Sequence, residues 1–223
     1  MMPMTTFDPM IHGFRFANRF RNTVARLPNG ATIRTSGRCG GMAFASLDIF
    51  HAGKKAPNHD WSGFERGVPP DGHPLADYLF QRLMNSFIEA SAVRFLTWTL
   101  LPDERTFVFK GVTGWTTDEI PKLRAQIDAG HPVALGLVGA RHISDVGRSN
   151  HQAVAFGYDV VKGGVDIAVY DNNSPRTTVT LSWRKGTDGV VATNRASPWR
   201  GLFAHSYAAA VPPKTLWQPP PAV

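Results

Sequence analysis

The sequence predicts an α+β fold of two lobes, with helices on one side and a curled antiparallel sheet on the other. Helical periodicity occupies the first half of the chain, and short β-rich runs separated by turn signals follow Gly130. Hydrophobic residues make up 43% of the 223 residues, which is typical of a globular protein. A chain of this length and composition is expected to build one well-packed core.

Proline gathers at both ends of the chain, where periodic patterns are weak. We therefore expect residues 1–12 to be a flexible N-terminus and residues 212–223 to be a Pro-rich C-terminal tail. Residues 13–211 then form a single domain. Inside it, the segment 54–74 accumulates Gly, Pro, His and Asp, so we expect it to be an excursion over the surface.

Three segments carry helical patterns. The first covers residues 40–50, where apolar residues fill most positions, and it is expected to begin at Cys39 or one residue to either side. The second covers residues 74–95, where leucines recur every four residues. The third covers residues 117–129 and ends at Gly130.

Five runs rich in β-forming residues follow: 132–138, 152–158, 165–170, 177–183 and 203–210. The pair Gly163-Gly164 predicts a hairpin between the second and third runs. An Asp-Asn-Asn-Ser-Pro sequence over 171–175 predicts a turn before the fourth.

An arginine-rich segment lies near the N-terminus, where Arg15, Arg19, Arg21 and Arg26 alternate with phenylalanines. This composition suits either a helix that lies on an anionic surface or a helix that packs its aromatic residues on the protein and exposes its charges. We expect the second arrangement.

The net charge and the absence of certain motifs limit the partners that we expect for the protein. The chain has 24 Lys+Arg against 17 Asp+Glu, a net charge of +7 that permits attraction to nucleic acid, anionic lipid or acidic substrates without selecting among them. No basic groove motif accompanies the aromatic residues, so we expect no nucleic-acid partner. No signal-peptide pattern or apolar run of membrane-spanning length is present, so we expect a cytoplasmic protein without a membrane span.

A single cysteine excludes an intrachain disulfide and any metal site with two cysteine ligands. His51, His59 and His73 match no metal-binding spacing. We therefore expect neither a metal nor another cofactor.

Cys39 lies where a glycine-bearing loop enters the first helix. The positive end of a helix dipole and the free N–H groups of the first turn favour a thiolate, which is the nucleophilic form of cysteine. The flanking glycines allow a substrate to approach closely, and the backbone N–H of Cys39 is a donor for a developing oxyanion.

His151 precedes a buried strand, and Asp171 follows the next one. If these strands pair as an antiparallel hairpin, the start of one lies beside the end of the other. The carboxylate of Asp171 then orients the His151 ring and stabilises its protonated form, and His151 takes the proton of Cys39.

Three motifs carry a family resemblance: Cys-Gly-Gly-Met from Cys39, His-Gln-Ala-Val-Ala-Phe-Gly-Tyr from His151, and Val-Tyr-Asp-Asn-Asn around Asp171. Together they resemble the papain-like cysteine peptidases, most closely the leader-peptidase domains of bacteriocin-exporting transporters and their uncharacterised bacterial relatives. The resemblance implies a papain-like fold, in which the helix bearing Cys39 faces the sheet. It also implies a catalytic triad of Cys39, His151 and Asp171. Papain itself uses Asn at the third station, so Asn172 is an alternative orienting residue.

The resembled enzymes place a Gln about six residues before the cysteine, and this chain has Ile33 there. Side chains that are candidates for the missing oxyanion donor are Asn29, Thr35, Ser36 and Arg38.

These features favour a thiol-protease-like hydrolase that acts on an amide or thioester bond of a peptide or acyl substrate. An acyltransferase of the same fold, in which an amine resolves the thioester, is one alternative. A catalytically silent module that binds a peptide or partner in the same cleft is another.

Overall fold

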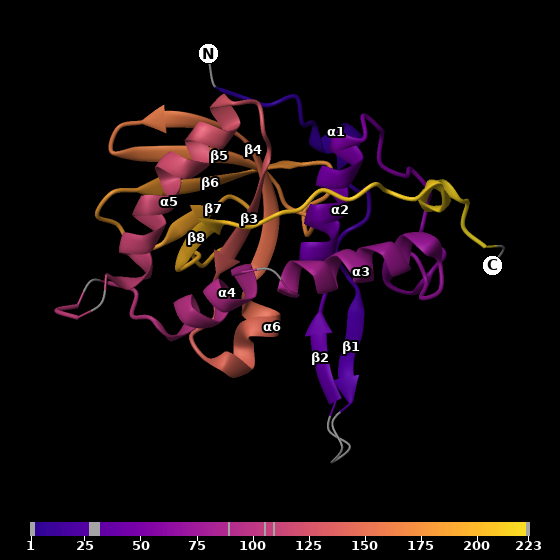
Figure 1. Cartoon of the computed structure of the whole chain (residues 1–223), viewed down its shortest axis with the longest axis horizontal. Coiled ribbons are helices and arrows are strands. Elements are labelled where there is room, and N and C mark those ends of the chain that lie inside the picture. Colours follow the sequence, from indigo (N-terminus) through magenta and orange to yellow (C-terminus); the bar gives the residue numbers. More distant parts are fainter. Residues whose placement is uncertain (1–2, 27–31, 89, 105, 109, 222–223) are drawn as a thin grey trace.

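The computed structural model describes residues 3–26, 32–88, 90–104, 106–108 and 110–221. It has the expected α+β composition with a curled antiparallel sheet (Figure 1). The helices are α1 (Pro9–His12), α2 (Cys39–His51), α3 (Pro74–Ile88), α4 (Ala90–Leu100), α5 (Gly111–Asp128) and α6 (Val146–Ser149). The strands are β1 (Arg21–Arg26), β2 (Thr32–Ser36), β3 (Val133–Val138), β4 (His151–Val161), β5 (Gly164–Tyr170), β6 (Thr178–Arg184), β7 (Val190–Ala192) and β8 (Gly201–Ala204). The predicted arrangement had helices on one side only, but helices lie on both sides of the sheet: α5 lies over the sheet, and α2 and α3 lie on the other side (Figure 1).

The main sheet has the order β7-β6-β5-β4-β3-β8, and all of its neighbouring strands are antiparallel. The predicted hairpin between β4 and β5 is confirmed: Val161 pairs with Gly164, and Gly163 adopts the left-handed φ of 77° that the turn needs. β8 ends at Ala204, well before the predicted end of the last strand at residue 210.

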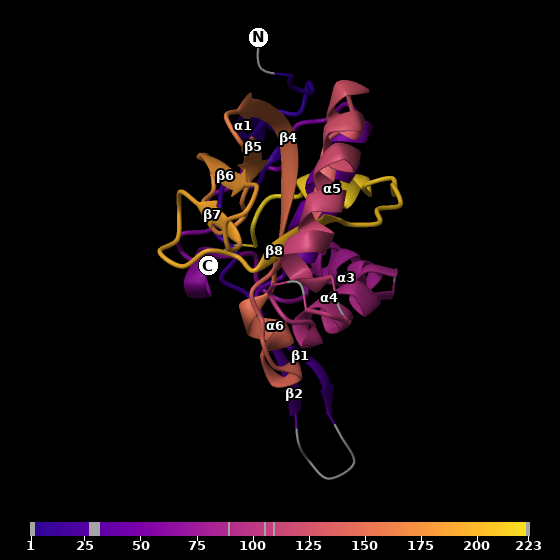
Figure 2. The same cartoon turned by 90° about the vertical axis from the view of Figure 1, so that its left-hand side faces the viewer.

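Both faces of the sheet are covered. On one face lies α5 (Figure 2). Its buried residues form a core with Ala153 and Ala155 of β4. On the other face, Val154 and Phe156 pack against Phe44 and other residues of α2. Because successive strand residues point to opposite faces, this double coverage explains why β4 is buried continuously from His151 to Tyr158.

Two predicted helices have different bounds. The structure describes the segment 74–95 as α3, which ends at Ile88, and α4, which runs from Ala90 to Leu100; residue 89 between them lies outside the described residues. The predicted helix 117–129 begins earlier, at Gly111, whose left-handed φ of 75° and missing side chain let the backbone pass Glu104 closely. Thr117, the predicted first residue, therefore lies inside the helix, where its Oγ1 donates a hydrogen bond to the Thr113 carbonyl.

The arginine-rich segment is not a helix. Its first part is non-helical and buries Phe14, Phe16 and Phe20, and its second part is β1, which pairs with β2 in a hairpin that projects from the helical side (Figure 1). The predicted burial of the aromatic residues is confirmed, but the prediction that this segment forms a helix is wrong. Apolar and charged residues alternate with a period of two in Phe14-Arg15-Phe16, which is the pattern of an extended chain rather than of a helix.

The folded body extends beyond both predicted ends of the domain. Phe7 is 2% exposed in the core between α2 and the sheet, and the backbone N–H of Thr5 donates to the Phe156 carbonyl. In the tail, Leu216 is fully buried against the helical lobe. An apolar side chain in each terminal segment finds a place in a core, and this holds the segment on the body.

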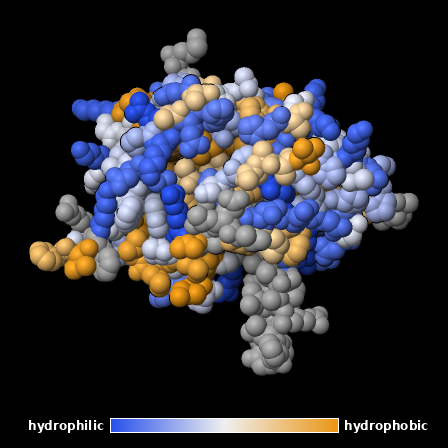
Figure 3. Space-filling view, in the orientation of Figure 1, coloured by the Kyte–Doolittle hydropathy of each residue, from blue (hydrophilic) through white to orange (hydrophobic). Residues whose placement is uncertain are grey.

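Exposed apolar side chains gather over α4 and the loop that follows it (Figure 3); they are Val93, Leu96, Leu100, Phe107 and Val108. Within the described residues, no helix combines the length and the apolar character that crossing a membrane requires.

Gly41 allows α2 and α3 to approach each other closely. A Cβ atom at this position would lie 1.9 Å from the Leu79 carbonyl oxygen, which belongs to the α3 backbone. We expect Gly41→Ala to lower the free energy of unfolding by about 3 kcal/mol, because the two helices must separate. Urea denaturation measures this change.

Gly114→Ala in α5 is the matched control. A Cβ there meets only the flexible side chain of Lys110, so the substitution is expected to leave stability unchanged or to raise it by up to about 1 kcal/mol. Equal urea midpoints for the two variants would contradict the close approach of the helices at Gly41.

Candidate active site

Cys39 is the first residue of α2, and its backbone is fixed from two sides. The N–H of the preceding Arg38 donates to Asn18 Oδ1 at 2.5 Å. Asn172 Nδ2 donates to the carbonyl oxygens of Cys39, at 3.1 Å, and of Gln152, at 3.0 Å. The start of the helix is therefore tied to the sheet, and the Cys39 residue itself stays partly exposed.

His151 and Asp171 meet as the hairpin predicts. β4 begins at His151 and β5 ends at Tyr170, and the pairing of Val154 with Tyr170 brings these two strand ends together. His151 Nε2 donates to Asp171 Oδ1 at 2.7 Å. The residues are 5% and 4% exposed, so the pair is shielded from water.

The Asp171 carboxylate is held by several donors. The backbone N–H of Asn173 donates to Oδ1 at 2.8 Å, and Asn194 Nδ2 donates to Oδ2 at 2.7 Å. Burial alone would raise the pKa of Asp171, but the charge and hydrogen bond of His151, with these donors, lower it to about 2. Asp171 is therefore ionised at neutral pH.

His151 is the protonated partner of this pair. Burial alone would lower the pKa of the imidazole, but the charge and hydrogen bond of Asp171 outweigh it, and a hydrogen bond with the Cys39 side chain adds to their effect. The pKa of His151 is raised to about 10. The ring thus connects the carboxylate to the sulfur.

Trp199 covers one face of the His151 ring. The two rings are stacked, with centroids 5.9 Å apart and an interplanar angle of 8°. On Trp199 lies the guanidinium of Arg195, 3.8 Å from the centre of the indole. This stack limits rotation of the imidazole and keeps water from that side of the ion pair.

Two pockets meet at Cys39 and His151. One is lined by apolar side chains, namely Leu83, Phe87, Phe95 and Val146. The other is lined by basic side chains, namely Arg19, Arg21, Arg66 and Arg148. Both pockets share Cys39 and His151, so the sulfur faces a cleft that is apolar on one side and positively charged on the other.

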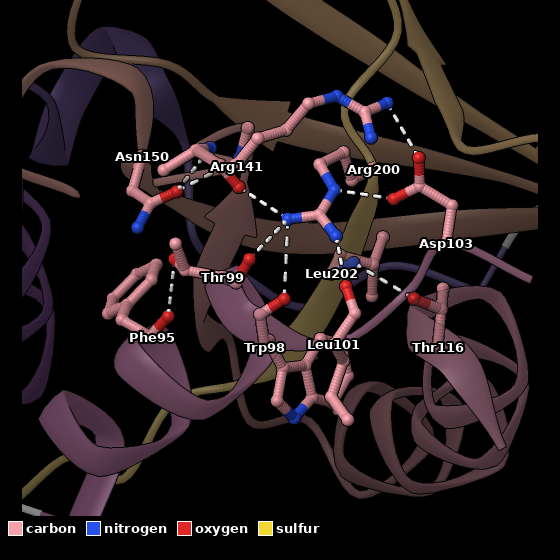
Figure 4. Close-up of polar contacts among 12 residues, drawn as sticks. Phe95, Trp98, Thr99, Leu101, Asp103, Thr116, Arg141, Asn150, Arg200 and Leu202 are labelled. Atoms are coloured by element: carbon pink, nitrogen blue, oxygen red, sulfur yellow. Dashed lines mark hydrogen bonds and ion pairs between the residues drawn. The ribbon is translucent and has the colours of Figure 1, made fainter. Parts of the chain in front are cut away.

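Asn150 lines both pockets. The oxygen of its side-chain amide accepts hydrogen bonds, whereas the nitrogen has no described hydrogen-bond partner. Oδ1 accepts the N–H groups of Gly139 and Ala140, each at 2.9 Å. Nδ2 is buried without a hydrogen-bond partner among the described residues. Figure 4 shows this nitrogen turned away from the bonds that hold the oxygen.

The buried guanidinium of Arg200 holds the loop on which Asn150 depends. It donates to the carbonyls of Ala140, of Thr99 (3.1 Å) and of Leu101 (2.5 Å), and to Asp103 Oδ1 (Figure 4). One side chain thus joins the end of α4 to the loop after β3. The orientation of the Asn150 amide is set by this network.

The structure brings Cys39, His151 and Asp171 together, as the three motifs predict. The side chain of Asn172, the alternative orienting residue, is directed to backbone carbonyls at the start of α2 and of β4 instead of to the imidazole. Its neighbour Asn173 lies closer to the ring, with Nδ2 3.5 Å from His151 Nε2.

The four candidate oxyanion side chains have different positions. Ser36 lines both pockets. Thr35 precedes it on β2, where Ile33 also lies, and Asn29 lies outside the described residues. Arg38 points into the helical lobe, where its guanidinium donates to Asp71 Oδ1 at 2.7 Å and stacks on the Phe20 ring, so it is engaged away from the cleft.

Sequence reasoning missed Asn150, Asn194 and Trp199. Asn150 precedes His151 directly, and this adjacency is the one signal that points to it. Asn194 and Trp199 lie between β7 and β8, far along the chain, and carry no local pattern that indicates a site.

In comparisons with known proteins, no family model, curated protein or solved structure matches the chain. Its chemistry therefore has to follow from the arrangement at the cleft. The partly exposed Cys39 at the start of a helix lies beside a protonated imidazole, and a buried carboxylate orients that imidazole. This is the arrangement that nucleophilic thiol catalysis requires.

Proposed function

We propose that the protein is a papain-like cysteine hydrolase in which Cys39 attacks the carbonyl carbon of an amide or thioester. The observation that carries the proposal is the buried His151, which is held between the Asp171 carboxylate and the Cys39 side chain. A cation beside the sulfur favours its thiolate form. Catalysis then begins from a thiolate–imidazolium pair.

In the first step, a bond forms between the Cys39 sulfur and the carbonyl carbon. The bond to the leaving nitrogen or sulfur breaks, and the leaving atom takes the proton of His151. In the second step, His151 accepts a proton from water, whose oxygen attacks the thioester. The products are a carboxylic acid and Cys39, and the proton on His151 restores the starting pair.

The developing oxyanion needs donors near the sulfur. The N–H of Cys39 belongs to the first turn of α2, where N–H groups have no partner within the helix. Asn150 is the second donor in this proposal, because the residue lines the same cleft and its buried Nδ2 has no described partner. In this role it replaces the glutamine of the resembled enzymes, whose position Ile33 occupies in this chain.

The test is acylation of Cys39 by p-nitrophenyl acetate, followed by mass spectrometry. We expect one acetyl group per chain, formed at least tenfold faster than on a free cysteine peptide at about pH 6, and then released by water. Asn150→Asp keeps the acceptor for Gly139 and Ala140 but removes the donor, and is expected to slow acylation about a hundredfold.

Acylation no faster than that of the free peptide would overturn the proposal. An acetyl group that is stable in water but transferred to an added amine would assign acyl transfer instead of hydrolysis. A rate unchanged in Asn150→Asp would remove this residue from the oxyanion site.

A further inference from the structure

The cleft beside Cys39 continues into a second basic pocket. Arg19 and Arg66 line both the pocket at Cys39 and this neighbour, to which Arg15 and Arg176 also contribute. We call the combined surface the arginine groove; its arginines are Arg15, Arg19, Arg21, Arg66, Arg148 and Arg176. All six side chains are exposed, and the groove leads to the candidate nucleophile.

Little negative charge within the protein neutralises these arginines. Arg66 pairs with the neighbouring Glu65, and Arg148 pairs with Asp145. Among the described residues, the other four arginines of the groove form no ion pair. One carboxylate, Asp60, lines the groove, and it accepts hydrogen bonds from Ser62. The groove is therefore strongly positive.

The backbone offers a second, independent observation. Arg66 and Arg176 have φ angles of 61° and 65°, and among the described residues they are the two non-glycine residues with left-handed backbone. Glycine would adopt these angles at a lower cost. Both positions instead carry an exposed guanidinium, and both face the same groove. Backbone strain of this kind is concentrated at functional sites.

We propose that the substrate of the Cys39 site is an acidic peptide, whose carboxylates lie in the arginine groove; this rests on the proposed hydrolase function. The guanidinium fork matches a carboxylate with two parallel hydrogen bonds. An apolar residue of the same peptide occupies the opposite pocket, formed by Leu83, Phe87, Phe95 and Val146. The carbonyl to be attacked then lies at the junction, over Cys39.

Nucleic acid is the competing polyanion, and the aromatic residues argue against it. Phe16, Phe20 and Trp61 line the groove but are 8%, 4% and 2% exposed, so they present no open ring faces on which bases stack. Proteins that bind single strands combine basic grooves with such stacking platforms. The groove therefore favours carboxylates on a peptide.

The test uses hexaglutamate and hexaglutamine as matched peptides. At low salt, hexaglutamate is expected to slow the alkylation of Cys39 by neutral iodoacetamide at least fivefold, and hexaglutamine to leave it unchanged. Fluorescence anisotropy of labelled hexaglutamate measures binding directly, whatever the reactivity of the thiol. The double variant Arg19→Gln/Arg148→Gln is expected to weaken binding about tenfold. Lys162→Gln/Lys185→Gln removes the same charge from exposed residues outside the groove and is expected to bind as the wild type does.

The outcomes separate this proposal from the hydrolase proposal. A reactive thiol with neither binding nor protection would overturn the acidic substrate and leave the hydrolase standing. Binding that depends on Arg19 and Arg148, with an unreactive thiol, would support the acidic-peptide groove and overturn the hydrolase. Tighter binding of an oligodeoxythymidylate of equal charge would overturn the peptide proposal in favour of nucleic acid.

Discussion

His151→Gln is expected to make the alkylation of Cys39 by iodoacetamide steeply dependent on pH. Cys39 is the only cysteine in the chain, so the reagent reports on one site. In the wild type, the imidazole has a pKa raised to about 10, so it stays protonated beside the sulfur. With the proposed thiolate–imidazolium pair in place, the alkylation rate is expected to vary less than about threefold from pH 5 to 8. An ordinary thiol, with a pKa of about 8.5, becomes several hundredfold more ionised over that range.

The glutamine variant removes the cation but keeps a side chain of similar length. Its rate is expected to rise about a hundredfold or more between pH 5 and 8, which approaches the profile of a free cysteine peptide. His51→Gln is the matched control, because His51 is exposed at the other end of α2 and is expected to keep the flat profile. A wild-type profile as steep as that of the free peptide would rule out the thiolate–imidazolium pair.

The sequence predicts the centre of the site because its signals are local. The glycines around Cys39 indicate the start of a helix, and Gly163-Gly164 indicates the hairpin that brings His151 beside Asp171. Each inference needs only the pattern of a short segment and one pairing rule. Those elements lie where they were expected.

The surroundings of the site were missed because they depend on contacts between distant segments. Asn194 reaches the Asp171 carboxylate, and Trp199 the imidazole, from the segment between β7 and β8. The arginine groove brings together the segment before β1, a left-handed turn at Arg66 and another at Arg176. No hydrophobic periodicity or sequence motif predicts that these arginines lie together, because their positions are set by the tertiary packing of loops.

The same distinction explains the errors at the termini. Proline content predicts that a segment leaves the regular elements, and neither terminal segment forms a full strand or long helix among the described residues, although Met4 forms an isolated bridge with Gly157 of β4. Proline content does not indicate whether a single apolar side chain in the segment is buried. Phe7 and Leu216 are buried, and the two terminal segments therefore belong to the folded body.

Asp171→Asn is expected to lower the free energy of unfolding by about 3 kcal/mol at about pH 6, because it breaks a buried ion pair. The folded-state pKa of His151 is raised, so its contribution to stability is complete below about pH 6.5 and is lost as the pH rises to about 10. The folded-state pKa of Asp171 is lowered, so its contribution is complete above about pH 4 and is lost as the pH falls to about 2.

The difference between the wild type and Asp171→Asn should therefore be largest between about pH 4 and 6.5, and should shrink toward about pH 10. Urea denaturation at about pH 6 and pH 9 measures it. Asp159→Asn makes the same chemical change at an exposed position of β4 and is expected to alter stability by less than about 0.5 kcal/mol at both values. A difference that stays the same from pH 6 to pH 9 would mean that the imidazole is already neutral in the folded protein at pH 6. The sulfur would then lack the neighbouring cation on which the proposed chemistry depends.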